Sequence, residues 1–419
     1  MQHVPDSPTP DAYANPAGSA PVYAWERRLL STVLRWLGAP PVAIELWNGE
    51  TVFPARGVQP HRLVLHRRAA LHRLCCNPGR YLGELYSRGD IEIEGDLYAL
   101  LCLLYQGYEQ AMARHPVLAW LWRERRVRRR HYHSSASRLR HHYDLGDDFY
   151  ARWLDREHRQ YSCAYYPRPG LGLEEAQSAK MHHICRKLRL RAGESVLEAG
   201  CGWGGLALFM ARHYGVRVTA CNLSPAQLDY ARACVQRSGL GTRIELLEAD
   251  FRELAGEYDA FVSVGMLEHI GPDHFGALGA VLERCLKPQG RGLIHAIGRN
   301  RPWPTNAWIE RRIFPGAYPP TLREVLAVLE PYAFSVLDVE NLRLHYVQTL
   351  LQWRERFEAQ AQDIAAERGE PFLRAWRLYL CGSAAAFSTG WLQLFQVVFH
   401  RAQDNDLPWS RGHLYSADD

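Results

Sequence analysis

A glycine-rich stretch between a short strand and a helix constrains the fold of this chain more than any other feature. It reads Glu198-Ala-Gly-Cys-Gly-Trp-Gly-Gly205, at the end of a predicted strand over 195–198 and before a helical pattern over 206–214. Glycines permit a tight turn and let a ligand approach the backbone closely. The start of a helix attracts an anionic group such as a carboxylate. The pattern is typical of a nucleotide-binding loop at the edge of an open α/β sheet.

Strands and helices alternate around this loop. Short apolar strands are predicted at 216–220, 244–247, 260–264 and 292–297, and helices at 225–238 and 272–285. Such alternation implies a parallel sheet with helices on both faces. Residues 340–391 are largely helical and interrupt the return to a last strand at 393–399. We therefore expect an α/β fold: a Rossmann-like sheet with a helical insertion near the C-terminus.

The residues around the loop favour S-adenosylmethionine as the ligand, although Gly-x-Gly alone is weak evidence. Glu198 precedes the first glycine by two residues, and Trp203-Gly-Gly205 follows. The second strand ends at Asn222, where many nucleotide folds place an acid that holds the ribose. Asn222 and Gln227 can supply hydrogen bonds there instead. Asp250 and Phe251 follow the third strand, where an adenine contact is expected.

The first part of the chain has the pattern of a separate, smaller α+β domain. Residues 41–53 alternate around Asn48-Gly49, which predicts a hairpin. Helical patterns at 67–74 and 96–113 flank a strand at 90–95. We expect a flexible leader over 1–20, this domain over 21–115, a basic linker over 116–136 and the nucleotide-binding domain over 137–419. The leader lacks the apolar core of a signal peptide, so we expect a cytosolic protein.

The linker concentrates arginine. Six of the eight residues from Arg123 to Arg130 are arginines, with Glu124 as the only acid among them. The run is either a solvated linker or a segment attracted to an anionic membrane surface, where each basic residue contributes about 1 kcal/mol. No other feature resembles a nucleic-acid-binding module, and we expect no nucleic acid partner. The ten cysteines show no C-x-x-C pair, so we expect neither disulfides nor a metal site.

Five ordered motifs resemble one family over residues 137–403. They are His142-Tyr-Asp-Leu-Gly146, Gln160-Tyr-Ser-Cys-Ala-Tyr165, Leu197–Gly205, Ser263-Val-Gly-Met-Leu-Glu-His-Ile-Gly271 and Leu293-Ile-His-Ala-Ile-Gly298. The chain resembles cyclopropane-fatty-acyl-phospholipid synthases and mycolic acid cyclopropane synthases, which have a class I methyltransferase sheet. The first domain resembles, more loosely, the N-terminal lipid-binding-type domain of the phospholipid enzymes. The mycolate enzymes lack that domain, so its presence favours a phospholipid substrate.

The resemblance implies roles for particular residues. The implied cofactor contacts are Tyr143, Tyr161, Ser162, Glu198, Gly200, Cys201, Gly202, Asn222, Gln227, Asp250 and Phe251. The implied bicarbonate site comprises Cys163, Glu268, His295, Tyr346 and the backbone at Ile297. Cys381 matches a cysteine often designated an active-site residue, and we expect its role to be indirect because the cofactor is itself the electrophile. Two positions depart from the family: its usual Asp is Glu198 here, and its usual Thr is Asn222.

The chemistry of such a reaction explains these residue types. An alkene that attacks a sulfonium methyl group becomes a cation, and a proton must leave before a ring closes. The site therefore needs an apolar tunnel, a base and groups that stabilise a cation. Aromatic rings contribute about 0.5–2 kcal/mol each to a nearby cation, and the candidates are Tyr143, Tyr161, Tyr165 and Phe275. A protein carboxylate beside the cation could be alkylated, so a bound bicarbonate is a reasonable base.

The resemblance thus predicts an enzyme that transfers a methylene group from S-adenosylmethionine to the cis double bond of unsaturated phospholipid acyl chains. The alternative is a methyltransferase of the same family whose product carries a methyl branch. A membrane-binding protein with an inactive catalytic domain is disfavoured by the intact loop and base residues. We expect association with the inner face of the cytoplasmic membrane, and a homodimer is the candidate assembly.

Overall fold

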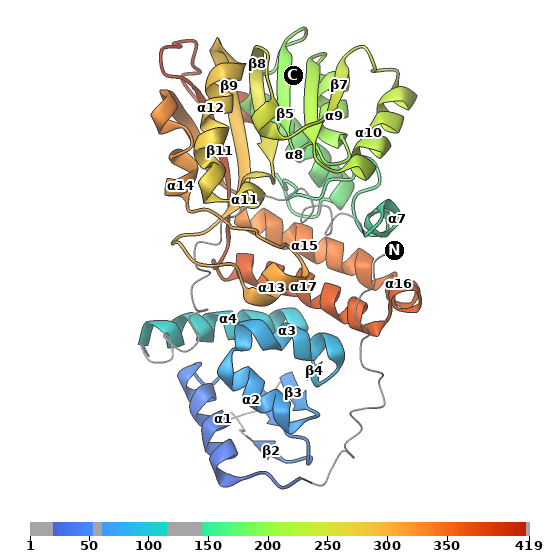
Figure 1. Ribbon diagram of the computed structural model, residues 1–419, viewed down its shortest axis with the longest axis vertical. Helices are drawn as coiled ribbons and strands as arrows, with labels where there is room; N and C mark the ends of the chain where they lie inside the picture. Colours follow the sequence, from blue (N-terminus) through green and yellow to red (C-terminus); the bar gives the residue numbers. More distant parts are fainter. Residues whose placement is uncertain (1–19, 53–60, 115–144, 416–419) are drawn as a thin grey trace. The chain divides into compact units, whose positions relative to one another are not determined.

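The computed structural model describes residues 20–52, 61–114 and 145–415, which form two compact units (Figure 1). One unit comprises the described residues up to 114, and the other those from 145 onward. The expected leader, basic linker and the boundary between the units lie almost wholly outside the described residues. Those boundaries therefore stay predictions.

The N-terminal unit is an α+β structure. Its elements are α1 (Ala24–Trp36), β1 (Val42–Glu45), β2 (Thr51–Val52), β3 (His61–Leu65), α2 (Arg68–Cys76), α3 (Pro78–Arg88), β4 (Ile91–Glu94) and α4 (Leu97–Arg114). The sheet order is β2-β1-β3-β4, with β1 antiparallel to β2 and parallel to β3. The predicted hairpin is confirmed, whereas α1, β3 and α3 were not predicted.

A buried acid ties helices α1 and α2 together. The Glu26 carboxylate is inaccessible to solvent and accepts hydrogen bonds from Arg68 at 2.7 Å and from His72 at 3.1 Å. The bond from Arg68 is the main reason why the pKa of Glu26 falls to about 2. A buried charge of this kind needs its partners, so these residues have a structural role.

The C-terminal unit contains a seven-stranded sheet of order β10-β11-β9-β8-β5-β6-β7. Its strands are β5 (Ser195–Ala199), β6 (Arg217–Asn222), β7 (Ile244–Glu248), β8 (Tyr258–Val264), β9 (Leu286–Gly298), β10 (Phe334–Asn341) and β11 (Gln393–Arg401). The strands from β7 to β9 pair in parallel, as predicted. The last strand departs from this parallel pattern, because β11 pairs antiparallel with both β9 and β10. Strand β10 was not predicted.

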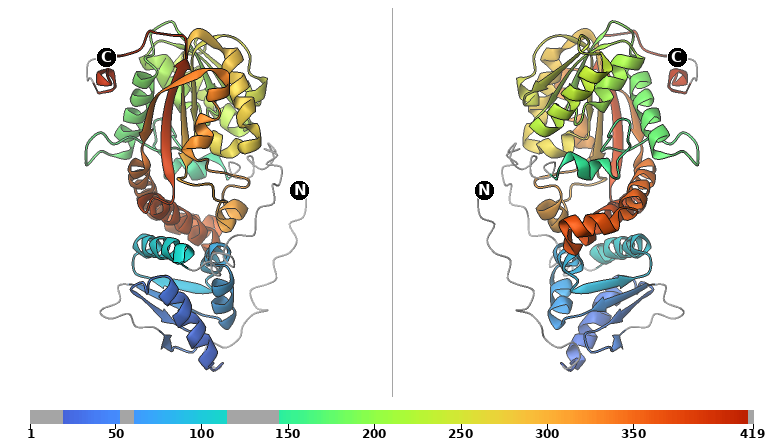
Figure 2. Two further views of the ribbon diagram at one scale, coloured as in Figure 1. Left: turned by 90° about the vertical axis from the view of Figure 1, so that its left-hand side faces the viewer. Right: turned by 90° about the vertical axis from the view of Figure 1, so that its right-hand side faces the viewer.

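Helices cover both faces of this sheet, which Figure 2 shows edge-on. On one face, α8 (Leu173–Lys187), α9 (Gly205–His213) and α10 (Pro225–Ser238) pack through apolar side chains onto Val196, Val262 and Leu293. On the other face, α12 (Phe275–Cys285) and α14 (Leu322–Leu326) pack onto Phe261 and Ile294. Neighbouring residues of β9 point to opposite faces, so His295 lies on the same face as α8.

The predicted helical insertion lies between β10 and β11. It consists of α15 (Arg343–Glu358), α16 (Ala361–Arg368) and α17 (Glu370–Ser388), and Figure 1 shows α15 and α17 side by side below the strand ends. Strand β10 runs parallel to β9, so the insertion leaves the sheet at the carboxyl ends of the parallel strands. The shorter helices of the unit are α7 (Asp147–Ala151), α11 (Leu267–Ile270) and α13 (Ala307–Arg312).

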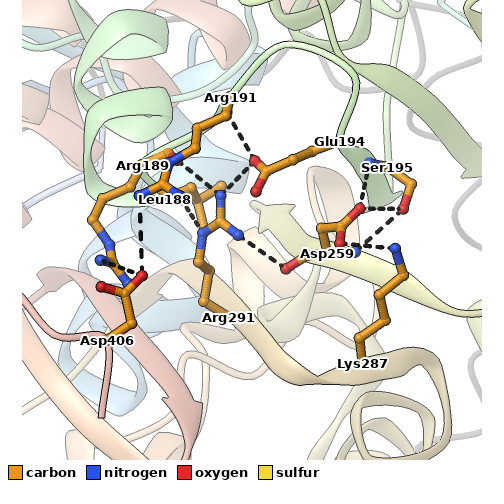
Figure 3. A network of polar contacts seen from close by, with 9 residues as sticks. All are labelled: Leu188, Arg189, Arg191, Glu194, Ser195, Asp259, Lys287, Arg291 and Asp406. Atoms are coloured by element: carbon orange, nitrogen blue, oxygen red, sulfur yellow. Dashed lines mark hydrogen bonds and ion pairs between the residues drawn. The ribbon is translucent and has the colours of Figure 1, made fainter. Parts of the chain in front are cut away.

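A polar network ties together the opposite, amino edge of the sheet (Figure 3). Arg291 on β9 donates hydrogen bonds to Leu188 O and Arg189 O at the end of α8 and forms an ion pair with Glu194 at 2.6 Å. Lys287 pairs with Asp259 at 2.8 Å, and Asp259 also accepts from Ser195. The cationic groups at this edge therefore satisfy a helix C-terminus and two strand starts.

All ten cysteines lie in the described ranges and are free thiols. No helix within residues 20–52, 61–114 and 145–415 is long and apolar enough to cross a membrane.

Candidate active site

The glycine-rich loop follows β5 and turns directly into α9. Gly200, Gly202 and Gly204 have φ angles of +85°, +53° and +77°, in the left-handed region that favours glycine. The N–H groups of Gly200 and Cys201 both donate to Cys221 O at 3.0 Å, which anchors the loop to the end of β6. The loop therefore has the strand–turn–helix geometry that its sequence predicts.

Asn222, at the end of β6, forms hydrogen bonds with the glycine-rich loop and with α10. Its side-chain amide donates to Gly202 O at 3.1 Å and to Gln227 Oε1 at 2.8 Å, and its oxygen accepts from Leu223 N–H at 2.8 Å. The hydroxyl of Ser224 accepts from Gln227 N–H at 3.4 Å, so Ser224 is the N-cap of α10 (Pro225–Ser238). These bonds hold the amides of Asn222 and Gln227 at the carboxyl end of β6.

A pocket opens between this loop and the ends of the neighbouring strands. Ten of the eleven predicted cofactor residues line it, and they are Tyr161, Ser162, Glu198, Gly200, Cys201, Gly202, Asn222, Gln227, Asp250 and Phe251. The eleventh, Tyr143, lies outside the described residues. Segments that are far apart in the sequence thus share one cavity.

The pocket has further lining residues that the sequence analysis did not single out for the cofactor. They are Arg159, Gln160, Trp203, Leu206, Cys221, Leu223, Ser224, Ala249, Val264, Gly265, Met266, His269 and Ile270. Arg159 has one buried guanidinium nitrogen for which residues 20–52, 61–114 and 145–415 offer no hydrogen-bond partner, and its guanidinium lies 4.0 Å from the centre of the Tyr230 ring. In the sequence, Arg159 directly precedes the motif that begins at Gln160, and this position is the signal by which it could have been found.

Glu198 is a buried carboxyl group at the base of the pocket. It is 3% exposed, and its Oε2 atom has no hydrogen-bond partner among the described residues. Burial raises its pKa to about 8, although the charge of Lys180 acts in the opposite direction. The Lys180 ammonium donates to Gln160 Oε1 and to Ser162 Oγ, the latter at 3.1 Å. Two residues that line the pocket, Gln160 and Ser162, are therefore held by a buried lysine that was not predicted.

Asp250 also lines the pocket and already has a cationic partner. Its carboxylate accepts two bonds from the Arg252 guanidinium, each of 2.8 Å. These bonds are the main reason why the pKa of Asp250 is lowered. The neighbouring Phe251 ring is 6% exposed, so the pair combines an apolar surface with a fixed negative charge.

Glu268, His295 and Ile297 come together just beyond the pocket. Glu268 belongs to helix α11, which begins shortly after β8 ends at Val264. Its Oε1 atom accepts from Ile297 N–H at 3.4 Å, and Gly265 N–H donates to His295 O at 2.8 Å. The carboxylate therefore continues the pairing of β9 where β8 has ended. Gly265, Met266, His269 and Ile270 around Glu268 all line the pocket.

This cluster contains polar atoms without partners. Glu268 is 5% exposed and His295 2%, and neither Glu268 Oε2 nor His295 Nε2 has a hydrogen-bond partner within the part of the chain that the structure describes. Burial raises the pKa of Glu268 to about 7 and lowers the pKa of His295 to about 3. Unsatisfied buried groups cost stability and are candidates for ligand contacts.

Cys163 and Tyr346 meet at residue Leu342, at the start of α15. Leu342 O accepts from Tyr346 N–H at 3.1 Å and lies 3.8 Å from Cys163 Sγ. Leu342 N–H donates to Leu394 O, and Leu394 pairs with Ile297 across β9 and β11. Backbone contacts thus connect these two residues to the cluster of Glu268. Burial raises the pKa of the Cys163 thiol, which keeps it neutral.

Cys381 and the aromatic candidates are placed differently. Cys381 lies on α17, is buried, and has its sulfur 3.9 Å from Arg354 Nη1, but it does not line the cofactor pocket. Tyr161 lines the pocket, and its hydroxyl is 2.9 Å from the Tyr379 hydroxyl. Tyr165 stacks between His183 and His345, and Phe275 packs in the apolar layer of α12. These last two rings have packing contacts that the motifs alone did not indicate.

Comparisons with known families match both parts of the chain. A family model described as mycolic acid cyclopropane synthetase matches residues 130–397. A model for a domain of unknown function matches residues 29–116.

Individual proteins support the match over the larger part. The chain is 35% identical to a probable fatty acid methyltransferase of Pseudomonas putida, over 90% of this chain and 96% of that protein. It is 41% identical to the cyclopropane-fatty-acyl-phospholipid synthase of Escherichia coli K12, over 64% of this chain and 69% of that protein. The crystal structure of mycolic acid cyclopropane synthase CmaA1, complexed with SAH and CTAB, superposes with a TM-score of 0.60 at 30% identity. That match covers 64% of this chain and 98% of the other.

Proposed function

This chain belongs to the mycolic acid cyclopropane synthetase family of S-adenosylmethionine-dependent transferases that act on lipids, and from that premise we propose a specific reaction. The enzyme transfers a methylene group to the cis double bond of unsaturated acyl chains in membrane phospholipids and so forms a cyclopropane ring. The observation that carries the proposal is the pair of unpartnered buried atoms, Glu268 Oε2 and His295 Nε2, beside the cofactor pocket.

The pocket residues suit S-adenosylmethionine. The N–H groups of the glycine loop and the unpartnered Arg159 nitrogen would hold its carboxylate, and Glu198 would hold its amino group. Asn222 and Gln227 would bind the ribose hydroxyls, and Phe251 would pack on the adenine. When bound, the cofactor supplies an electrophilic methyl group. A cationic group next to Glu198 would also bring the pKa of that carboxyl down from about 8.

A small oxyanion fits the cluster beyond the pocket, and bicarbonate is the proposed base. A neutral His295 with its proton on Nε2 would donate to it, and Ile297 N–H would donate to it in place of its 3.4 Å bond to Glu268 Oε1. Glu268 would accept its proton or share one with it. The pKa of about 7 at Glu268 allows either form near neutral pH. Cys163 and Tyr346, which both contact Leu342 at the start of α15, would border the bicarbonate site. A base that can exchange avoids permanent alkylation of a protein carboxylate.

Phospholipid chains are the proposed substrate because of two observations. The E. coli relative that carries phospholipid in its name matches at 41% identity. A separate N-terminal unit is also present, as expected of the phospholipid enzymes. The alternative product, a methyl-branched chain, is favoured by the P. putida relative, whose name is probable fatty acid methyltransferase and which matches over 96% of its length.

A product assay separates these two reactions. The purified protein is incubated with S-adenosylmethionine and vesicles of an unsaturated phospholipid, and the released acyl chains are analysed by gas chromatography and mass spectrometry. We expect cyclopropane chains. Methyl-branched chains alone would establish the alternative. Unmodified acyl chains from folded protein that binds S-adenosylmethionine would refute both reactions.

Removal of dissolved carbon dioxide tests the base. In purged buffer the rate should fall, and added bicarbonate should restore it, while formate should not. Equal rates with and without bicarbonate would refute this part of the proposal and leave the methylene transfer intact.

Association with the inner face of the membrane is proposed from the basic segment 116–136, which lies outside the described residues. Replacement of the six arginines between Arg123 and Arg130 by Gln should weaken binding to anionic vesicles at low salt. Replacement of the same six by Lys preserves the charge and should preserve binding. Sedimentation of vesicles measures both. An unchanged affinity of the Gln variant would return the segment to the role of a solvated linker.

A homodimer remains part of the proposal for the assembled enzyme. Light scattering at several protein concentrations would measure the molecular mass. A mass of one chain, 48.0 kDa, at every concentration would exclude the dimer.

A further inference from the structure

A row of buried polar side chains crosses three strands next to His295. His295 on β9 is the register partner of Gln396 on β11, and Gln396 is the partner of Glu340 on β10. Lys187 reaches the row from the end of α8. Its ammonium donates to Glu340 Oε2 at 2.5 Å and to Gln396 Oε1 at 2.7 Å. Gln396 Nε2 then lies 3.1 Å from His295 Nδ1.

The order of donors and acceptors along this row has only one favourable arrangement. A lysine ammonium only donates, so the amide oxygen of Gln396 must face Lys187 and the amide nitrogen must face His295. The reverse orientation would place an N–H group against the ammonium. Because the Gln396 amide nitrogen donates, His295 Nδ1 must accept and cannot carry a proton.

We propose that Lys187 and Gln396 are positioning residues that hold His295 as the neutral imidazole with its proton on Nε2. This inference rests on the proposed role of His295 in the active site. His295 itself is neutral, because burial and the charges of Lys180 and Lys187 lower its pKa to about 3. A neutral imidazole has one proton, and the Gln396 bond leaves Nε2 as its place.

The protonated Nε2 has two consequences for the site. It is a buried donor without a protein partner among the described residues, so it is available to an oxyanion beside Glu268. It also has no free lone pair. The opposite tautomer would expose an unprotonated nitrogen near an electrophilic methyl group, where it could itself be alkylated, and it would repel the oxyanion.

Glu340 and His183 keep the lysine charged. Burial lowers the pKa of Lys187, but the Glu340 carboxylate opposes that change. Burial likewise raises the pKa of Glu340, yet the bond from His183 at 2.7 Å and the charge of Lys187 outweigh it and bring that pKa to about 2. The Lys187–Glu340 pair is therefore ionised at neutral pH, and the direction of the Gln396 amide is fixed.

Nitrogen NMR of histidine reports this directly in the resting protein. The full-length chain is labelled with ¹⁵N-histidine, and two-bond proton–nitrogen correlations assign the tautomer of each ring. The signals of His295 are identified by their loss in His295→Gln. We expect a neutral ring protonated on Nε2. A ring protonated on Nδ1, or an imidazolium, overturns the inference.

Variants of Gln396 test the cause. In Gln396→Glu the new carboxylate can only accept, so Nδ1 of His295 should become protonated, and the rate of product formation should fall about a hundredfold. In Gln396→Met no side chain donates to Nδ1, and both tautomers should be populated. The double variant Lys187→Met with Glu340→Gln removes the ion pair without leaving a buried charge, and it should also give both tautomers.

Gln393→Met is the matched control. Gln393 is another buried glutamine of β11, and its amide is held by Asn341 at 2.8 Å and by Gly390 O at 2.7 Å. It should leave the His295 tautomer unchanged, and thermal unfolding confirms that each variant is folded. The inference fails if Gln396→Glu keeps the proton on Nε2, or if Gln393→Met alters the tautomer as Gln396→Met does. A wild-type ring protonated on Nε2 in a protein that makes no cyclopropane would support the inference while refuting the proposed function.

Discussion

The amino and carboxyl edges of the seven-stranded sheet, where its parallel strands begin and end, differ in whether their polar groups have partners. At the amino edge, the charges of Arg291 and Lys287 are matched by Glu194, Asp259 and the end of α8 (Figure 3). At the carboxyl edge, Glu198, Glu268 and His295 each bury an atom that has no hydrogen-bond partner in the described ranges.

The difference separates stability from chemistry within one sheet. Satisfied buried groups add to the free energy of unfolding, whereas an unsatisfied one costs about 1–3 kcal/mol. Such a cost is sustained where a ligand supplies the missing partner, so the carboxyl edge is prepared for ligands at the expense of stability. Substitutions at the two edges should therefore affect activity and stability separately.

Glu268→Gln should have the largest effect, a loss of activity without a loss of stability. The amide cannot accept a proton from the proposed base, so the rate should fall about a thousandfold, or about 4 kcal/mol in barrier height. Cofactor affinity, measured by calorimetry, should stay within about threefold because Glu268 lies beyond the pocket. A collapse of cofactor binding would show that this carboxylate belongs to the cofactor site instead.

Arg291→Met should have the next largest effect, and on stability alone. It leaves Glu194 and two carbonyls at the end of α8 without their partner, so the free energy of unfolding should fall by about 3 kcal/mol. Urea unfolding measures this loss. The rate per folded molecule should be unchanged at low temperature, and a large loss of kcat in folded protein would contradict the separation of the two edges.

The pH dependence of stability should distinguish Glu268→Gln from the wild type. The pKa of Glu268 is raised from 4.5 to about 7 by burial, so the folded state binds the proton more tightly than the unfolded state. Wild-type stability therefore falls as pH rises from about 4.5 to about 7, and the amide variant escapes that fall. Above neutral pH the variant should be more stable by about 3 kcal/mol.

At acidic pH the two proteins should unfold at similar urea concentrations, which provides the internal control. Equal stability of the two proteins at every pH would mean that folding does not raise the pKa of Glu268.

Lys287→Met should have the smallest effect. The lysine side chain is 37% exposed and that of Asp259 25%, so solvent screens the pair. We expect a loss of about 0.5–1 kcal/mol that shrinks further in high salt. Thermal unfolding at two salt concentrations measures it, and a loss as large as that of Arg291→Met would show that the amino edge acts as one cooperative network.

Local sequence patterns were sufficient for the cofactor half of the site. The glycines at 200, 202 and 204 require left-handed backbone, and the strand before them and the helix after them are short-range features. Ser224-Pro225 marked the start of α10 for the same reason. These features depend on neighbours in the chain, which a sequence displays directly.

Contacts between residues far apart in the chain could not be predicted from the sequence. Strand β10 alternates weakly and is defined by its partner β11, which comes after the helical insertion. Glu268 could be recognised as a candidate, but its place on α11 depends on where β8 ends. Lys180 and Lys187 look like ordinary charged helix residues, yet both are buried.

The sequence by itself determined that the chain contains a strand–glycine loop–helix unit, alternating strands and helices, and acids and a histidine in motifs of a lipid-modifying family. Only the tertiary structure decided which of these groups find partners. Strand register places Gln396 against His295 and Lys187, while Glu268 occupies the position beyond β8 where no strand remains to pair. The reason is physical: a hydrogen bond depends on distances of a few ångström between residues that can be a hundred or more positions apart in the chain.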